Sequence, residues 1–233
     1  MAAAAAEPRK ISIGVLYLDH YQLLDAVGPM DLMNMASISY AGKFAPEAIK
    51  ALAPEITWHH ISAGYPAPVA SSAGIPMLPT TGLAHCPPLD YLLIPGPPPA
   101  TRLSEAEKAF IVARAAETDV KAVMTVCTGS LMLSQTGLLS NGTLACSNKK
   151  SLLALAAAGT VPPGVRWCRD RRWVVDGKFW SSAGITAGMD LGVQWVRRVV
   201  GEEVLQWVKE VAEYDPIEAG GDRFGYLLTD VDL

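Results

Sequence analysis

Cys127 is the side chain in this sequence best placed to act as a nucleophile. The apolar run at residues 122–126 predicts a buried strand, and Thr128, Gly129 and Ser130 supply the small and polar residues that open a helix. The cysteine therefore occupies the turn between the two. Unpaired backbone N–H groups and the positive end of the helix dipole favour thiolate over thiol, and thiolate is the nucleophilic form. A buried structural cysteine is the alternative that this segment alone leaves open.

Two further residues follow predicted strands, as Cys127 does. Asp25 comes shortly after the β-branched run at 11–18, and Gly96 follows the apolar run at 90–95. In a parallel sheet the ligand site lies beyond the carboxyl ends of the strands, so we expect these three residues to gather at one edge.

The elements that would position these residues alternate along the chain. A capping box at Ser104–Glu107 marks the start of one helix. Strands alternating with helices imply βαβ units and a largely parallel sheet. Strands are predicted at 11–18, 55–61, 90–95, 122–126 and 143–147, and further helices at 149–158, 184–200 and 202–214.

One antiparallel unit interrupts this alternation. A β-hairpin is predicted over 166–182, with its turn at Asp176 and Gly177. We interpret the charged run 169–172 as the solvated edge of that hairpin. Thr186 and Asp190 are predicted to cap or start the helix that follows Ile185.

Composition limits the class of protein. A chain of 233 residues that is 50% hydrophobic and 18% charged predicts one α/β domain over 11–233, after a disordered tail at 1–10. The net charge of −4 gives no basic footprint for nucleic acid, and no run is long enough to span a membrane. The four cysteines show no spacing typical of metal ligands, and no signal peptide precedes them. We therefore expect reduced thiols, no metal or other cofactor, and a cytoplasmic location.

Four segments together resemble the ThiJ/PfpI superfamily, which has the class I glutamine amidotransferase-like fold, and within it the isonitrile hydratase-like branch. The resemblance implies a flavodoxin-like sandwich, in which helices flank a mostly parallel central sheet, and a nucleophilic cysteine on a sharp strand-to-helix turn. It also implies a homodimer. The segments are Leu-Leu-Asp-Ala-Val-Gly-Pro (23–29), Cys-Pro-Pro-Leu-Asp-Tyr-Leu-Leu-Ile-Pro-Gly (86–96), Val-Cys-Thr-Gly-Ser (126–130) and Ala-Gly-Ile-Thr-Ala-Gly-Met-Asp (183–190).

The resemblance also implies roles for individual residues. Cys127 matches the nucleophile, and Asp25 matches the acidic residue beside it. A carboxyl group held against the thiol can take its proton or give one to substrate, so Asp25 would be the general acid/base. A helix N-cap or turn residue is the alternative for Asp25. The expected substrate-binding residues are Thr128, Gly96, Pro97 and Ile185.

This sequence departs from the superfamily pattern at two places. Many members carry a histidine after the next strand, but residues 145–148 read Ala-Cys-Ser-Asn, so a Cys–His dyad is not expected unless another histidine, such as His20, reaches the site. Pro97 stands where a second glycine commonly donates its N–H to a developing oxyanion, and proline has no N–H. Losing such a donor disfavours acyl chemistry of the amidase or protease kind.

The function we expect is a cysteine-dependent hydratase or lyase acting on a small molecule, most like isonitrile hydratase. Its product would be an N-substituted formamide. A related lyase or a glyoxalase-like enzyme of specialised metabolism is the enzymatic alternative. A protein that binds a ligand or senses oxidation through Cys127 without catalysis is the alternative of a different class.

Overall fold

A six-stranded sheet forms the centre of the computed structural model, which describes residues 7–233. Neighbouring strands pair in parallel except at one edge, where β9 runs antiparallel to β10. This confirms the expected α/β class with a mostly parallel sheet. In spatial order the strands are β2 (Glu55–Ile61), β1 (Lys10–Leu16), β5 (Tyr91–Ile94), β6 (Ala122–Val126), β10 (Phe179–Ser182) and β9 (Trp173–Asp176).

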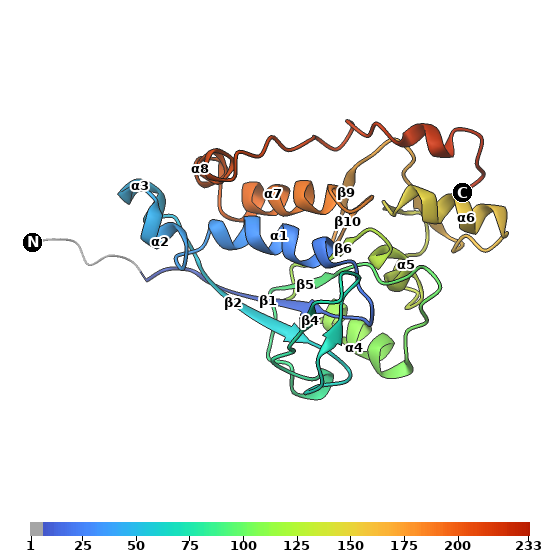
Figure 1. Cartoon of the computed structure of the whole chain (residues 1–233), viewed down its shortest axis with the longest axis horizontal. Coiled ribbons are helices and arrows are strands. Elements are labelled where there is room, and N and C mark those ends of the chain that lie inside the picture. The colour runs from blue at the N-terminus through green and yellow to red at the C-terminus, as the bar shows by residue number, and fades with distance from the viewer. Residues whose placement is uncertain (1–6) are drawn as a thin grey trace, which may run out of the picture.

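Helices cover both faces of this sheet (Figure 1). Alternate side chains of each strand point to opposite faces, so Tyr91 and Leu93 pack with one core and Leu92 and Ile94 with the other. The first core lies under α1 (Leu23–Met35), α7 (Ala187–Val199) and α8 (Glu202–Ala212), and the second under α4 (Glu105–Ala116), α5 (Gly129–Ser134) and α6 (Lys149–Ala157).

Shorter elements complete the chain. No helix within residues 7–233 is both long and apolar enough to cross a membrane. The remaining helical turns are α2 (Ala41–Phe44), α3 (Glu47–Lys50), η1 (Leu83–His85) and η2 (Gly225–Leu228), and two small sheets pair β3 (Val69–Ala70) with β4 (Pro76–Met77) and β7 (Thr143–Ala145) with β8 (Val165–Trp167).

Local sequence signals predicted several boundaries correctly. The strands at 55–61 and 122–126 have the expected bounds. The capping box forms as expected, because the Ser104 hydroxyl accepts the Glu107 N–H and the Glu107 carboxylate accepts the Ser104 N–H. Of the tail expected at 1–10, residues 1–6 lie outside the described residues, and strand β1 begins at Lys10.

The predicted hairpin is shorter than expected. Its turn lies at Asp176 and Gly177, and Gly177 has a φ of 54°. Its strands, however, cover only 173–182. Residues 165–167 instead form β8, which pairs in parallel with β7, a strand more than twenty residues earlier in the chain. The prediction of extended backbone at 166–167 was correct, but the predicted pairing of these residues with the other strand of the hairpin was wrong.

The interpretation of 169–172 as a solvated edge is wrong for Arg172. This side chain is buried, and its Nε donates to Asp190 Oδ2 at 2.6 Å. The other carboxylate oxygen, Oδ1, accepts the Tyr214 hydroxyl at 2.5 Å and the Ile217 N–H at 2.9 Å. Thr186 holds the N-cap position of α7, and Asp190 lies in the first turn without capping it. Asp190 instead joins that helix to the strand edge and to the C-terminal segment.

We expect the Asp190→Asn substitution to destabilise the fold by about 3–5 kcal/mol, because it leaves the Arg172 guanidinium buried without a counter-charge. Urea unfolding monitored by circular dichroism measures this difference. Glu202→Gln is the matched control, since it removes the exposed partner of Arg197 and should change the free energy of unfolding by less than about 1 kcal/mol. Equal losses in the two variants would contradict the assignment.

Candidate active site

The backbone at Cys127 makes a sharp turn between β6 and α5. Its φ is 58°, in the left-handed region that residues with a side chain rarely adopt. Surrounding hydrogen bonds hold this conformation in place. The Cys127 N–H donates to the Ser182 carbonyl oxygen at 3.2 Å, and its carbonyl oxygen accepts the hydroxyls of Ser130 at 3.1 Å and Ser147 at 3.0 Å. The expected nucleophile-elbow geometry is therefore present.

Two glycines let neighbouring loops approach this turn. A Cβ atom at Gly129 would lie 2.2 Å from the Ile94 carbonyl oxygen. At Gly96 it would lie 2.4 Å from Thr128 Oγ1, 2.7 Å from Thr128 N and 2.9 Å from Asp25 Oδ2. No larger residue fits at either position unless the backbone shifts. The ends of β5 and β6 thus come together with the start of α1, as the sequence predicted.

Asp25 lies in the first turn of α1 and is fully buried. Its Oδ2 accepts the Gly96 N–H at 3.1 Å, while Oδ1 has no hydrogen-bond partner of standard geometry within residues 7–233. The N-cap position belongs to Gln22, and no side chain caps this helix. The alternative role for Asp25, as a cap, is therefore wrong. Its carboxyl group lies close to Cys127, whose side chain lowers the pKa of Asp25.

Burial sets the proton equilibria of this pair. It raises the pKa of Asp25 to about 7, although hydrogen bonds from Gly96 and Cys127 partly oppose that rise. Burial and the negative charge of Asp25 raise the pKa of Cys127 to about 12, against hydrogen bonds from Thr128 and Asn148 that lower it. The expectation that this turn favours thiolate over thiol is therefore wrong. The Thr128 N–H at the start of α5 lowers the pKa of the thiol, but burial and the charge of Asp25 outweigh it.

Thr128 and Pro97 lie beside Gly96, as Asp25 does. Both are buried, and the Thr128 hydroxyl donates to the Pro97 carbonyl oxygen at 2.5 Å. Pro97 has no N–H to offer a substrate, and the Gly96 N–H is already bound to Asp25. Neither residue supplies the backbone donor that acyl transfer would need at this loop.

A cavity of about 240 Å³ lies next to the turn. Ile185 lines it, as expected for a pocket wall, together with Asn148, and Phe224 and Leu227 of the C-terminal segment close another side. Asn148 connects this cavity to Cys127, because its side chain lowers the pKa of the thiol and the preceding Ser147 donates its hydroxyl to the Cys127 carbonyl oxygen. The structure therefore brings together Cys127, Asp25, Thr128, Gly96 and Pro97, with Ile185 in the adjoining cavity.

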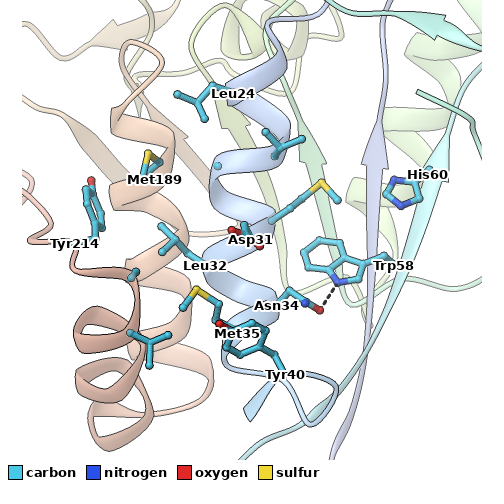
Figure 2. A pocket seen from close by; sticks show the side chains of 15 residues that line it. Leu24, Asp31, Leu32, Asn34, Met35, Tyr40, Trp58, His60, Met189 and Tyr214 are labelled. Carbon is cyan, nitrogen blue, oxygen red and sulfur yellow. Dashed lines mark hydrogen bonds between the residues drawn. The ribbon is translucent and has the colours of Figure 1, made fainter. Parts of the chain in front are cut away.

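A groove of about 770 Å³ runs along α1 at a different place (Figure 2). Trp58 lies in it and donates its indole N–H to Asn34 at 3.3 Å, with Tyr214 on the opposite wall. Neither Cys127 nor Asp25 is among the residues that line this groove. Cys127 and Asp25 do not line the smaller cavity either, but Asn148 and Ala183 do, and Ala183 follows Ser182, whose carbonyl oxygen accepts the Cys127 N–H.

Histidine and metal chemistry find no support in this region. His20 is exposed beside Asp19, and His60 hydrogen-bonds the Tyr17 hydroxyl at 2.9 Å. No histidine contributes to the pKa of Cys127. Within residues 7–233 no group of three His, Cys, Asp or Glu side chains could hold a metal ion.

Sequence reasoning missed the role of Asn148. It lies in the Ala-Cys-Ser-Asn segment where superfamily members often have histidine, and it caps α6 through Ser151. An asparagine between a strand and a helix is a recognisable N-cap signal. Nothing local in the sequence, however, shows that the same amide also reaches Cys127.

We expect Asp25→Asn to stabilise the protein at high pH. The folded carboxyl group keeps its proton up to about pH 7, whereas in the unfolded chain it loses that proton near pH 4. Between these values the folded state binds more protons, so wild-type stability falls as pH rises. The free energy of unfolding of the asparagine variant, relative to that of wild type, should therefore increase by roughly 2–4 kcal/mol between pH 4 and pH 8.

Urea unfolding at several pH values measures this advantage. Asp31→Asn, which changes an exposed carboxyl group on the same helix, is the control and should show no comparable growth. A pH-independent difference between Asp25→Asn and wild type would contradict the raised pKa.

Known proteins provide an independent comparison. The model of the DJ-1/PfpI family matches residues 11–198. An isonitrile hydratase from Pseudomonas putida is 31% identical over 206 residues, which cover 88% of this chain and 79% of that protein. The crystal structure of a ThiJ/PfpI family protein from Pseudomonas syringae superposes with a TM-score of 0.70 at 26% identity, covering 90% of this chain and 77% of that one.

A more distant structure shares the fold alone. Drosophila melanogaster DJ-1beta gives a TM-score of 0.63 at 16% identity, with 88% of this chain and 99% of that chain covered. The sequence resemblance and the flavodoxin-like architecture are thus both confirmed. The chain belongs to the DJ-1/PfpI family.

Proposed function

We propose that this protein is a hydratase that converts isonitriles, R–N≡C, into N-substituted formamides. The observation that supports this most directly is the buried pair of Cys127 and Asp25, in which a neutral thiol faces a carboxyl group with a pKa of about 7. Such a pair can move one proton at neutral pH. The 31% identity to an isonitrile hydratase supports the choice of substrate.

The first step of the proposed reaction adds the thiol across the terminal carbon. The Asp25 carboxylate takes the proton from Cys127, and the sulfur forms a bond to the electrophilic isonitrile carbon. Asp25 then returns the proton to that same carbon. The product is a thioimidate, R–N=CH–S–Cys, and no proton has been gained from or lost to solvent.

Water completes the reaction. It adds to the thioimidate carbon while Asp25 takes one of its protons and passes that proton to the nitrogen. The C–S bond then breaks, the hydroxyl oxygen becomes the formamide carbonyl, and Asp25 transfers the hydroxyl proton to the leaving sulfur of Cys127. The net change is addition of one water to R–N≡C to give R–NH–CHO.

The surroundings of the thiol fit this reaction better than acyl transfer. Attack on an isonitrile carbon forms no oxyanion, so the missing N–H at Pro97 carries no penalty in the first step. Amide or ester hydrolysis would form one there, with the Gly96 N–H already bound to Asp25.

The alternative functions have weaker support. A glyoxalase-like activity usually goes with a Glu–Cys–His set of site residues, whereas this chain has Asp25 and Ser147 in the segments where Glu and His would be expected. Oxidation sensing depends on thiolate character, and burial holds the pKa of Cys127 near 12, so the thiol is protonated at rest. The homodimer and the cytoplasmic location stay predictions.

We expect purified wild-type protein to form formamide from a simple aryl or alkyl isonitrile, and both Cys127→Ala and Asp25→Asn to lose at least about a hundredfold in kcat/KM. Loss of the isonitrile infrared band and chromatographic detection of the formamide measure turnover. Cys86→Ala is the matched control, because Cys86 precedes β5 and so lies at the opposite edge of the sheet from Cys127. A wild-type protein without turnover would overturn the proposal.

The pH dependence should follow Asp25. Proton removal from the thiol needs the carboxylate form, so kcat/KM should rise with pH and level off above an apparent pKa of about 7. Initial rates between pH 5 and pH 9 measure this profile. An activity that keeps rising with the ionisation of a free thiol above pH 8 would show instead that the thiolate forms without Asp25.

A further inference from the structure

Asn148 has a fixed orientation at the start of α6. Its Oδ1 accepts the Ser151 N–H at 3.0 Å and also lies 3.3 Å from the Ser151 hydroxyl. An amide oxygen that caps a helix cannot exchange places with the amide nitrogen, because the nitrogen accepts no hydrogen bond. The Nδ2 group must therefore point away from the helix.

The neighbouring contacts show what that nitrogen faces. The preceding residue, Ser147, donates its hydroxyl to the Cys127 carbonyl oxygen at 3.0 Å, so this segment is docked on the strained turn. Asn148 Nδ2 lies 3.6 Å from the position a Cβ would take on Gly184, on the wall of the 240 Å³ cavity. Interaction with the Asn148 side chain lowers the pKa of the Cys127 thiol, so the amide lies close to the sulfur. Asn148 thus lies between the nucleophile and the cavity.

We propose that Asn148 is a catalytic residue whose amide N–H donates to the Cys127 sulfur. The inference rests on the proposed function, to whose machinery it adds a residue. A thiolate forms when Asp25 removes the thiol proton and again when the C–S bond breaks. A donor held in place by the helix cap stabilises the sulfur at both moments without having to reorganise.

The identity of this residue also limits the proton chemistry. A histidine here could hold a second proton and pair with a resting thiolate. The amide of asparagine donates hydrogen bonds and does not titrate in this range. Among residues 7–233, Asp25 is then the only proton carrier beside the sulfur, and the thiol stays protonated until substrate arrives.

Three variants separate this role from helix capping. Asn148→Ser and Asn148→Asp both keep a good N-cap residue, so their melting temperatures should stay close to that of wild type. Serine is too short to reach the sulfur and adds no charge, whereas aspartate places a negative charge beside it. Asn148→His replaces the donor by one that can carry a positive charge.

Iodoacetamide alkylation of Cys127 at pH 8, followed by peptide mass spectrometry, gives the rate constants. We expect serine to slow alkylation roughly tenfold, aspartate to slow it more, and histidine to restore at least the wild-type rate. Isonitrile turnover should fall in the serine and aspartate variants in the same order.

The two readouts keep this inference separate from the proposed substrate. If wild type does not turn over isonitriles but the alkylation order holds, the proposed function fails and the contact between Asn148 and the sulfur stands. If the serine and aspartate variants alkylate at the wild-type rate with unchanged melting temperatures, Asn148 is only a helix cap and the inference is overturned.

Discussion

The left-handed backbone at Cys127 is the constraint on which the rest of this site depends. A non-glycine residue at a φ of 58° is costly, and three hydrogen bonds on its N–H and carbonyl oxygen hold it. The turn projects the thiol between neighbouring strand ends, but only because Gly96 and Gly129 leave room for the backbone there. Because these loops pack closely together, Asp25 lies next to the sulfur. The backbone strain, the close packing of the loops and the pairing of Asp25 with Cys127 therefore all depend on the turn at Cys127.

The same close packing removes water, and this sets the charge state of the pair. Desolvation raises the pKa of both Asp25 and Cys127, and each negative charge would oppose the other. The buried site therefore favours a single negative charge, placed on the carboxylate. A thiol that is protonated at rest but lies beside a base becomes nucleophilic only as it reacts. This protects the sulfur from oxidation while leaving it available to a neutral electrophile.

Much of the fold could be predicted from the sequence because its signals are local. The period-2 and apolar runs, the capping box at 104–107 and the small residues after Cys127 each act over a few positions. The features that were missed depend on distant partners. Arg172 is buried because it forms an ion pair with Asp190, and β8 pairs with β7. Asn148 lies near Cys127, which is 21 residues earlier in the chain. The predicted direction of the pKa shift of the Cys127 thiol was wrong for the same reason, since desolvation depends on all the residues that surround a group.

The two departures from the superfamily pattern have a common chemical effect. Pro97 removes a backbone N–H from the loop after β5, and the segment 145–148 lacks the histidine that many members carry there. The first change weakens stabilisation of an oxyanion, and the second removes a second proton carrier. Hydrolysis of an amide or ester needs both. Addition of a thiol to an isonitrile carbon needs neither, because one proton moves from sulfur to carbon through one carboxyl group. Each departure taken alone could be a neutral change, but together they favour the proposed addition reaction over hydrolysis.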